Sequence, residues 1–134
     1  MAGDFTPEAR APHRVLIVDD YDDTRDALAA MIGSAGFQVE SAWGAEDALR
    51  HLRAGFRPCV ALLDLRMPGM DGWALWDKMK ADPELAGIAV VLVSGDMVEC
   101  QRAEDLGIRE LITKPVEPDA LIAAIERHCR ETSA

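Results

Sequence analysis

The most restrictive feature of this sequence is a set of short, wholly apolar runs, each followed by a polar residue. The runs are VLIV (15–18), CVALL (59–63) and IAVVLV (88–93), and most of their residues are β-branched or leucine. A run without polar alternation predicts a strand that is covered on both faces, which is typical of a parallel sheet flanked by helices. These runs therefore indicate an α/β fold.

Segments with helical spacing alternate with the apolar runs. Leu28, Met31 and Ile32 share one face of the first such segment, and Gly33 and Gly36 follow it as helix-ending residues. The pattern predicts a five-stranded parallel sheet with helices on both faces. The expected strands are Val15–Val18, Phe37–Ala42, Cys59–Leu63, Ile88–Val93 and Arg109–Thr113. The expected helices are Asp22–Ile32, Ala45–Ala54, Asp71–Lys80, 97–106 and Asp119–Arg130.

The length and charge of the chain limit its function. With 134 residues, 49% of them apolar, the sequence fits one domain, for which we expect a flexible leader at 1–13, a folded body at 14–130 and a tail at 131–134. A net charge of −10 disfavours direct binding of nucleic acids or anionic membranes. No apolar run approaches the roughly 20 residues of a membrane span, and the amino end lacks the apolar segment of a signal peptide.

The cysteines give no sign of a disulfide framework or a zinc site. Cys59, Cys100 and Cys129 are odd in number and widely spaced, with no CxxC pair and no Cys/His ligand pattern. This usage predicts a reducing, cytoplasmic location. The three histidines, His13, His51 and His128, are expected at the surface. Trp73 and Trp76, spaced by one helical turn, are expected to pack against the sheet.

Polar side chains follow four of the expected strands. Asp19 and Asp20 follow the first strand, Asp64 the third, Ser94 the fourth and Lys114 the fifth. Because parallel strands place their carboxyl ends on one edge, these side chains are expected to converge, and crowded carboxylates favour a bound cation such as Mg²⁺. Taken singly, an Asp here is often a helix cap, and Ser-Gly or Lys-Pro an ordinary turn.

Four motifs together resemble the receiver domains of bacterial two-component response regulators. They are VLIVDD (15–20), LLDLRMPGMDG (62–72), VSG (93–95) and TKP (113–115), and the resemblance covers Arg14 to Arg130. It implies a flavodoxin-like strand order of 2-1-3-4-5 with the site at the point where strand order reverses. It also implies a phosphorylation-dependent signalling protein rather than an enzyme with an external substrate.

The resemblance implies a role for each residue of the carboxyl edge. Asp64 resembles the phospho-acceptor, and Ser94 and Lys114 resemble the hydroxyl and lysine that contact the phosphoryl group. Asp19 and Asp20 resemble the acidic pair that holds Mg²⁺ together with Asp64, with Asp20 the more direct ligand. The backbone carbonyl of Arg66 is the remaining protein ligand implied.

Two departures from the family concern residues that modulate such a site. Leu111 stands where members commonly carry an aromatic ring that moves on activation, and Gly95 stands where a small residue is usual. Arg66 and Asp96 lie two residues beyond the acceptor and the serine, and their opposite charges suggest a salt bridge over the site.

The implied partners are a sensor histidine kinase or histidine phosphotransfer protein, a downstream protein, and a second copy of the chain as a candidate dimer partner. A stand-alone receiver, a phosphorelay intermediate and a piece of a larger protein all fit the sequence. A Mg²⁺-dependent phosphohydrolase is disfavoured, because Arg66 occupies the position where the haloacid-dehalogenase type carries its second Asp. A degenerate receiver acting as a scaffold is disfavoured by the intact acidic, hydroxyl and lysine set, although Leu111 keeps that alternative open.

Overall fold

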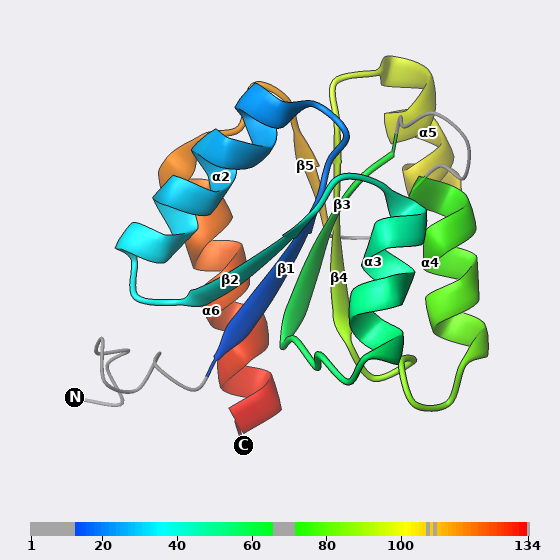
Figure 1. Ribbon diagram of the computed structural model, residues 1–134. Coiled ribbons are helices and arrows are strands. Elements are labelled where there is room, and N and C mark those ends of the chain that lie inside the picture. Colours follow the sequence, from blue (N-terminus) through cyan, green and yellow to red (C-terminus); the bar gives the residue numbers. More distant parts are fainter. Residues whose placement is uncertain (1–12, 66–71, 107, 109, 134) are drawn as a thin grey trace.

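The computed structural model describes residues 13–65, 72–106, 108 and 110–133. Strands and helices alternate along these residues (Figure 1). The strands are β1 (Arg14–Val18), β2 (Gln38–Ala42), β3 (Val60–Asp64), β4 (Ala89–Ser94) and β5 (Leu111–Thr113). The helices are α2 (Asp22–Ser34), α3 (Ala45–Arg53), α4 (Gly72–Ala81), α5 (Met97–Asp105) and α6 (Pro118–Ser133). Among these helices, none is both long and apolar enough to cross a membrane.

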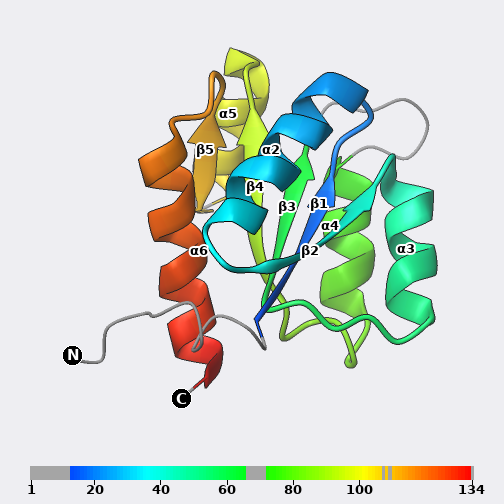
Figure 2. The same cartoon turned by 60° about the vertical axis from the view of Figure 1, so that its left-hand side comes forward.

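All five strands form one parallel sheet in the order β2-β1-β3-β4-β5. Helices α2 and α6 cover one face of the sheet, and α3, α4 and α5 cover the other (Figures 1 and 2). The structure thereby confirms the predicted α/β fold and the strand order that the resemblance implied. Strand order reverses between β1 and β3, the point at which open parallel sheets bind ligands.

The continuous apolar runs are explained by the two covered faces. In β1, Leu16 and Val18 pack on the side of α3 and α4, whereas Val15 and Ile17 pack on the side of α2 and α6. Successive side chains of a strand point to opposite faces, so each residue of a central strand meets a helix layer. The resulting core is rigid enough to hold the carboxyl ends of β1 and β3 in fixed register.

The bounds of most elements agree with the sequence prediction to within two residues, and two differences affect the site. Asp64 and Ser94 are the last residues of their strands rather than the first residues after them, because they still pair with Val93 and Thr113. At the other end of the chain, α6 continues to Ser133. The predicted starts of α4 and β5, Asp71 and Arg109, lie outside the described residues.

The tryptophans pack as predicted, but the histidines do not. Trp73 is buried in the core, and the half-buried Trp76 meets it edge to face, with 6.3 Å between the ring centroids. The histidines were predicted at the surface, whereas all three are half-buried. His51 Nδ1 lies 2.7 Å from Glu40 Oε1, and His128 Nε2 lies 3.2 Å from Glu110 Oε1. The sequence did not reveal these pairs, because the acidic partners, Glu40 and Glu110, belong to other segments of the chain.

Gly72 fixes the approach of α4 to the end of β3. A Cβ atom at this position would lie 2.4 Å from the carbonyl oxygen of Asp64 and 2.8 Å from Cα of Leu65. Both are backbone atoms, so neither can rotate out of the way. The absence of a side chain at Gly72 therefore lets the first turn of α4 touch the end of β3.

The substitution Gly72→Ala is expected to lower the free energy of unfolding by about 2 kcal/mol or more, because a methyl group must displace backbone. Gly33→Ala is the matched control, since a Cβ there meets nothing within 4 Å in α2. The control should leave stability unchanged or raise it by up to about 1 kcal/mol. Urea denaturation of both variants tests this, and equal stabilities would contradict the close-approach argument.

Candidate functional site

The carboxyl edge of the sheet gathers the polar residues that the sequence placed there. Asp19 and Asp20 follow β1, and Asp64 ends the neighbouring strand β3. One oxygen from each of the three carboxylates lies within 4.8 Å of the others. The predicted convergence is therefore confirmed. An oxygen-only donor set of this charge suits a hard divalent cation such as Mg²⁺.

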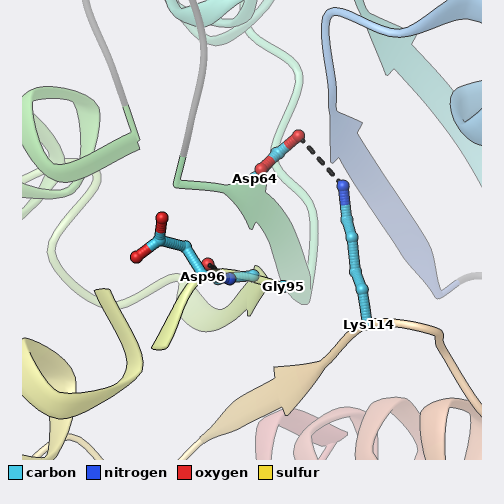
Figure 3. A pocket seen from close by; sticks show the side chains of 5 residues that line it. Asp64, Gly95, Asp96 and Lys114 are labelled. Atoms are coloured by element: carbon cyan, nitrogen blue, oxygen red, sulfur yellow. Dashed lines mark hydrogen bonds and ion pairs between the residues drawn. The ribbon is translucent and has the colours of Figure 1, made fainter. Parts of the chain in front are cut away.

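Lys114 joins two of these carboxylates. Its Nζ donates to Asp64 Oδ2 at 3.2 Å (Figure 3) and lies 3.7 Å from Asp19 Oδ2. The lysine side chain is 31% exposed, whereas the carboxyl groups of Asp19 and Asp64 are almost fully buried. If Lys114 and Pro115 formed only a surface turn, the Lys114 ammonium would lie in solvent. Its ion pairs with Asp19 and Asp64 show instead that Lys114 is part of this group of polar residues. The Lys114–Pro115 peptide bond is cis.

Asp19 is the most constrained of the carboxylates. Its Oδ1 accepts a hydrogen bond from the Tyr21 backbone N–H at 2.9 Å, and its carbonyl oxygen accepts one from Arg25 at 2.9 Å. Burial raises the pKa of the Asp19 carboxyl above its usual value, and the charge of Asp64 adds to that effect. The Tyr21 N–H and the Lys114 ammonium lower the pKa but do not compensate fully. Negative charge is therefore in excess at this edge.

Asp20 differs from its neighbour in being exposed. Of the three converging carboxylates, this one opens to solvent while the other two are buried against the sheet. A cation arriving from water would reach Asp20 without displacing packed side chains. The fourth ligand implied by the resemblance, the carbonyl of Arg66, lies outside the described residues.

Ser94 and Asp96 lie on the other side of the pocket. Ser94 is buried at the end of β4, and its Oγ accepts a hydrogen bond from the Asp96 N–H at 3.0 Å. The Asp96 carboxylate accepts from the backbone N–H groups of Val98 and Glu99, which makes Asp96 the N-cap of α5. Figure 3 shows its side chain turned away from the Asp64–Lys114 pair. The suggested bridge to Arg66 lies outside the described residues.

An open pocket of about 260 Å³ lies over these residues, lined by Asp64, Ser94, Gly95, Asp96 and Lys114. Gly95 lies beside the lysine, and a Cβ there would be in van der Waals contact with Lys114 Cβ at 3.4 Å. Leu111 pairs with Leu92 in the sheet and is half-buried against the core. It therefore lies two residue pairs below the Ser94–Thr113 pair at the end of the sheet, and it does not line the pocket.

A contact between the helices beside the pocket was missed by the sequence analysis. Trp73 Nε1 of α4 donates to Glu99 Oε2 of α5 at 2.6 Å, and the Arg102 guanidinium lies 4.5 Å from the centroid of the Trp73 ring. The i, i+3 spacing of Glu99 and Arg102 was the available signal, because it places both side chains on one face of α5.

Asp19→Asn is expected to stabilise the protein in the absence of divalent cations. A raised carboxyl pKa in the folded state means that stability is fully present at low pH and is lost as pH rises through that pKa. The variant keeps an acceptor for Tyr21 but carries no charge. Its advantage in free energy of unfolding over the wild type should therefore grow between about pH 4 and pH 7, measured by urea denaturation in EDTA.

The conservative control is Asp22→Asn, an exposed carboxylate on α2 that pairs with Arg25. This control should gain no stability as pH rises. The opposite result, in which the free energy of unfolding of the wild type rises with pH relative to that of Asp19→Asn, would show that the Asp19 charge is stabilising. It would contradict the argument that crowded carboxylates repel one another.

Comparison with known proteins agrees with this geometry. The family model described as "Response regulator receiver domain" matches residues 15–126. The chain is 40% identical to the C4-dicarboxylate transport transcriptional regulatory protein DctD of Rhizobium meliloti and 37% identical to the transcriptional regulatory protein FixJ of Bradyrhizobium diazoefficiens. These alignments include 84% and 87% of the chain, which spans 24% of DctD and 57% of FixJ.

A solved response regulator receiver protein from Pseudomonas putida is similar in structure. It matches with a TM-score of 0.77 and 32% sequence identity, over 86% of this chain and 96% of that one. The similarity extends over the parallel sheet and the helices described above. The chain belongs to the response regulator receiver domain family of two-component signalling.

Proposed function

We propose that this chain is a phosphorylation-dependent signalling switch in which Asp64 accepts a phosphoryl group from a phosphohistidine. The observation that carries the proposal is the direct contact of Lys114 Nζ with Asp64 Oδ2 inside an open pocket. The donor is a sensor histidine kinase or a histidine phosphotransfer protein. The phosphorylated chain then changes its contacts with a downstream protein.

The charges of the site support a role for Mg²⁺. Three carboxylates face one ammonium, a formal excess of two negative charges that a divalent cation balances. Asp19, Asp20 and Asp64 would hold the ion, with Asp20 the most accessible ligand and the Arg66 carbonyl a further oxygen. When bound, the ion would neutralise charge on the transferring phosphoryl group.

Each protein group has a distinct part in the transfer. A carboxylate oxygen of Asp64 forms the new bond to phosphorus as the bond to the histidine nitrogen breaks. Lys114 lies beside that carboxylate and would neutralise charge on the phosphoryl oxygens. Ser94 Oγ already accepts the Asp96 N–H, so its own proton can be donated to a phosphoryl oxygen.

Exposed apolar side chains near the same edge support a protein as the phosphoryl donor. Tyr21 and Trp43 follow β1 and β2, and Met97 and Val98 open α5 after β4; all four are more than half exposed. Large exposed apolar groups are typical of surfaces that contact other proteins. A small metabolite would use the enclosed part of a pocket instead, and this pocket is open.

Incubation with Mg²⁺ and a small phosphodonor such as acetyl phosphate is expected to add one phosphoryl group to the wild type. Asp64→Asn should add none, because an amide nitrogen or oxygen is a poor nucleophile compared with a carboxylate. Intact-mass spectrometry measures the adduct, and hydroxylamine should remove it because it is an acyl phosphate. EDTA should abolish its formation.

Asp96→Asn serves as the control, since this carboxylate caps α5 and is turned away from the Asp64–Lys114 pair (Figure 3). It should still accept one phosphoryl group. An adduct of equal yield in Asp64→Asn would rule out Asp64 as the acceptor. Sustained turnover of a phosphomonoester, far above hydrolysis of the protein's own adduct, would instead support the phosphohydrolase alternative.

Asp20→Ala is expected to weaken Mg²⁺ binding by at least about tenfold, because a cation site loses one of its few carboxylate ligands. Asp23→Ala is the matched control, an exposed aspartate in the first turn of α2. Isothermal titration with MgCl₂ measures both. Equal affinities for the two variants would exclude Asp20 as a ligand.

A further inference from the structure

A second group of ligand-type side chains lies at the opposite end of the sheet. His13 Nδ1 is 3.3 Å from Cys59 Sγ, and Cys129 Sγ completes a group whose atoms all lie within 4.8 Å of one another. The three residues come from before β1, before β3 and from α6. Their spacing in the sequence gave no Cys/His pattern, and the expectation of a surface His13 was wrong. The fold brings together these three segments, which are distant in the sequence.

Well-ordered elements hold the three side chains. The carbonyl oxygen of His13 accepts from the Gln38 N–H at 3.1 Å, and the Cys59 N–H donates to Arg14 at 2.8 Å. These bonds extend the sheet to the positions just before β1 and β3. Cys129 is fully buried in the same core cluster as Ile125 on α6. Figure 2 shows the start of β1 and the end of α6 at the same end of the molecule.

The chemistry and spacing of this group match a thiophilic cation. Two thiolates and one imidazole are ligands that Zn²⁺ prefers. In a tetrahedral zinc site with ordinary bond lengths, the sulfur and nitrogen ligands lie about 3.6 Å apart. The 3.3 Å between His13 Nδ1 and Cys59 Sγ is therefore close to the separation required. An ion would need only small side-chain rotations.

We propose that His13, Cys59 and Cys129 form a binding site for a thiophilic cation such as Zn²⁺, separate from the acidic site at the carboxyl edge. The two thiols lose their protons to solvent as the sulfur atoms bind the ion, and the imidazole binds as the neutral ring through Nδ1. A water molecule or an added ligand supplies the fourth position. Cys59 and Asp64 lie at opposite ends of β3, about 16 Å apart along the strand.

In the metal-free cluster the Cys129 thiol is held in its protonated form, so its deprotonation is a cost that ion binding must offset. Burial raises the pKa of the Cys129 thiol, and the adjacent Cys59 and Glu126 raise it further. The thiol therefore stays protonated and unreactive as long as no positive charge is nearby. A divalent cation would supply that charge and favour both thiolates.

Binding would tie the segment before β1 to β3 and α6. An ion held only by the folded chain stabilises it in proportion to the logarithm of metal concentration. A bound ion would therefore stabilise the end of the sheet that lies opposite Asp64, the proposed phosphorylation site. Signalling at Asp64 and cation binding here would use different ligands and different metals.

Titration of the reduced chain with Co²⁺ and then Zn²⁺, in excess Mg²⁺ to occupy the acidic cluster, tests the proposal. We expect one equivalent of Co²⁺ to produce thiolate-to-cobalt charge-transfer absorption, and Zn²⁺ to displace it and raise Tm. Cys59→Ser and His13→Gln should each lower Zn²⁺ affinity by at least about tenfold. Both positions are half-buried, so these variants test ligation without opening the core at Cys129.

Cys100→Ser is the matched control, because Cys100 is half-buried on α5 and near none of the three ligands. It should bind Co²⁺ and Zn²⁺ as the wild type does. Absence of the charge-transfer band from the reduced wild type would overturn the proposal. So would a band that survives unchanged in Cys59→Ser, since the thiolate would then come from elsewhere.

Discussion

The contact of a single ammonium with two buried carboxylates organises the carboxyl edge of this molecule. Lys114 follows the edge strand β5, whereas Asp19 and Asp64 belong to the two strands on either side of the order reversal. Without a cation, buried like charges would repel one another and favour protonation or separation of the strand ends. The lysine offsets part of that repulsion and leaves enough excess negative charge to attract a divalent ion.

The rigidity that keeps these charges together comes from the sheet below them. Each central strand is packed on both faces, by α2 and α6 on one side and by α3, α4 and α5 on the other. Gly72 brings α4 against the backbone carbonyl of Asp64, and the neighbouring Trp73 donates a hydrogen bond to Glu99 of α5. The contacts of Gly72 and Trp73 thus connect the end of β3 with α5, and neither contact involves Leu111.

Sequence reasoning located the acidic, hydroxyl and lysine residues of the edge because each directly follows, or ends, an apolar run. It placed Asp64 and Ser94 one residue outside strands that contain them, since polarity marks the end of an apolar run and not the end of backbone pairing. It did not foresee Asp96 as the cap of α5, although Asp is common at such positions. The partners of His51 and His128 were also missed, because acidic residues on other segments supply them.

By itself, the sequence determined that this chain forms a covered parallel sheet with a polar carboxyl edge, since apolar periodicity reports how each segment is buried. Only the tertiary structure decided which side chains touch. Lys114 lies 50 residues from Asp64, and His13 lies 46 from Cys59. Contacts over such separations depend on strand order and helix packing rather than on local pattern. The same sheet therefore brings oxygen ligands together at one end and sulfur and nitrogen ligands at the other.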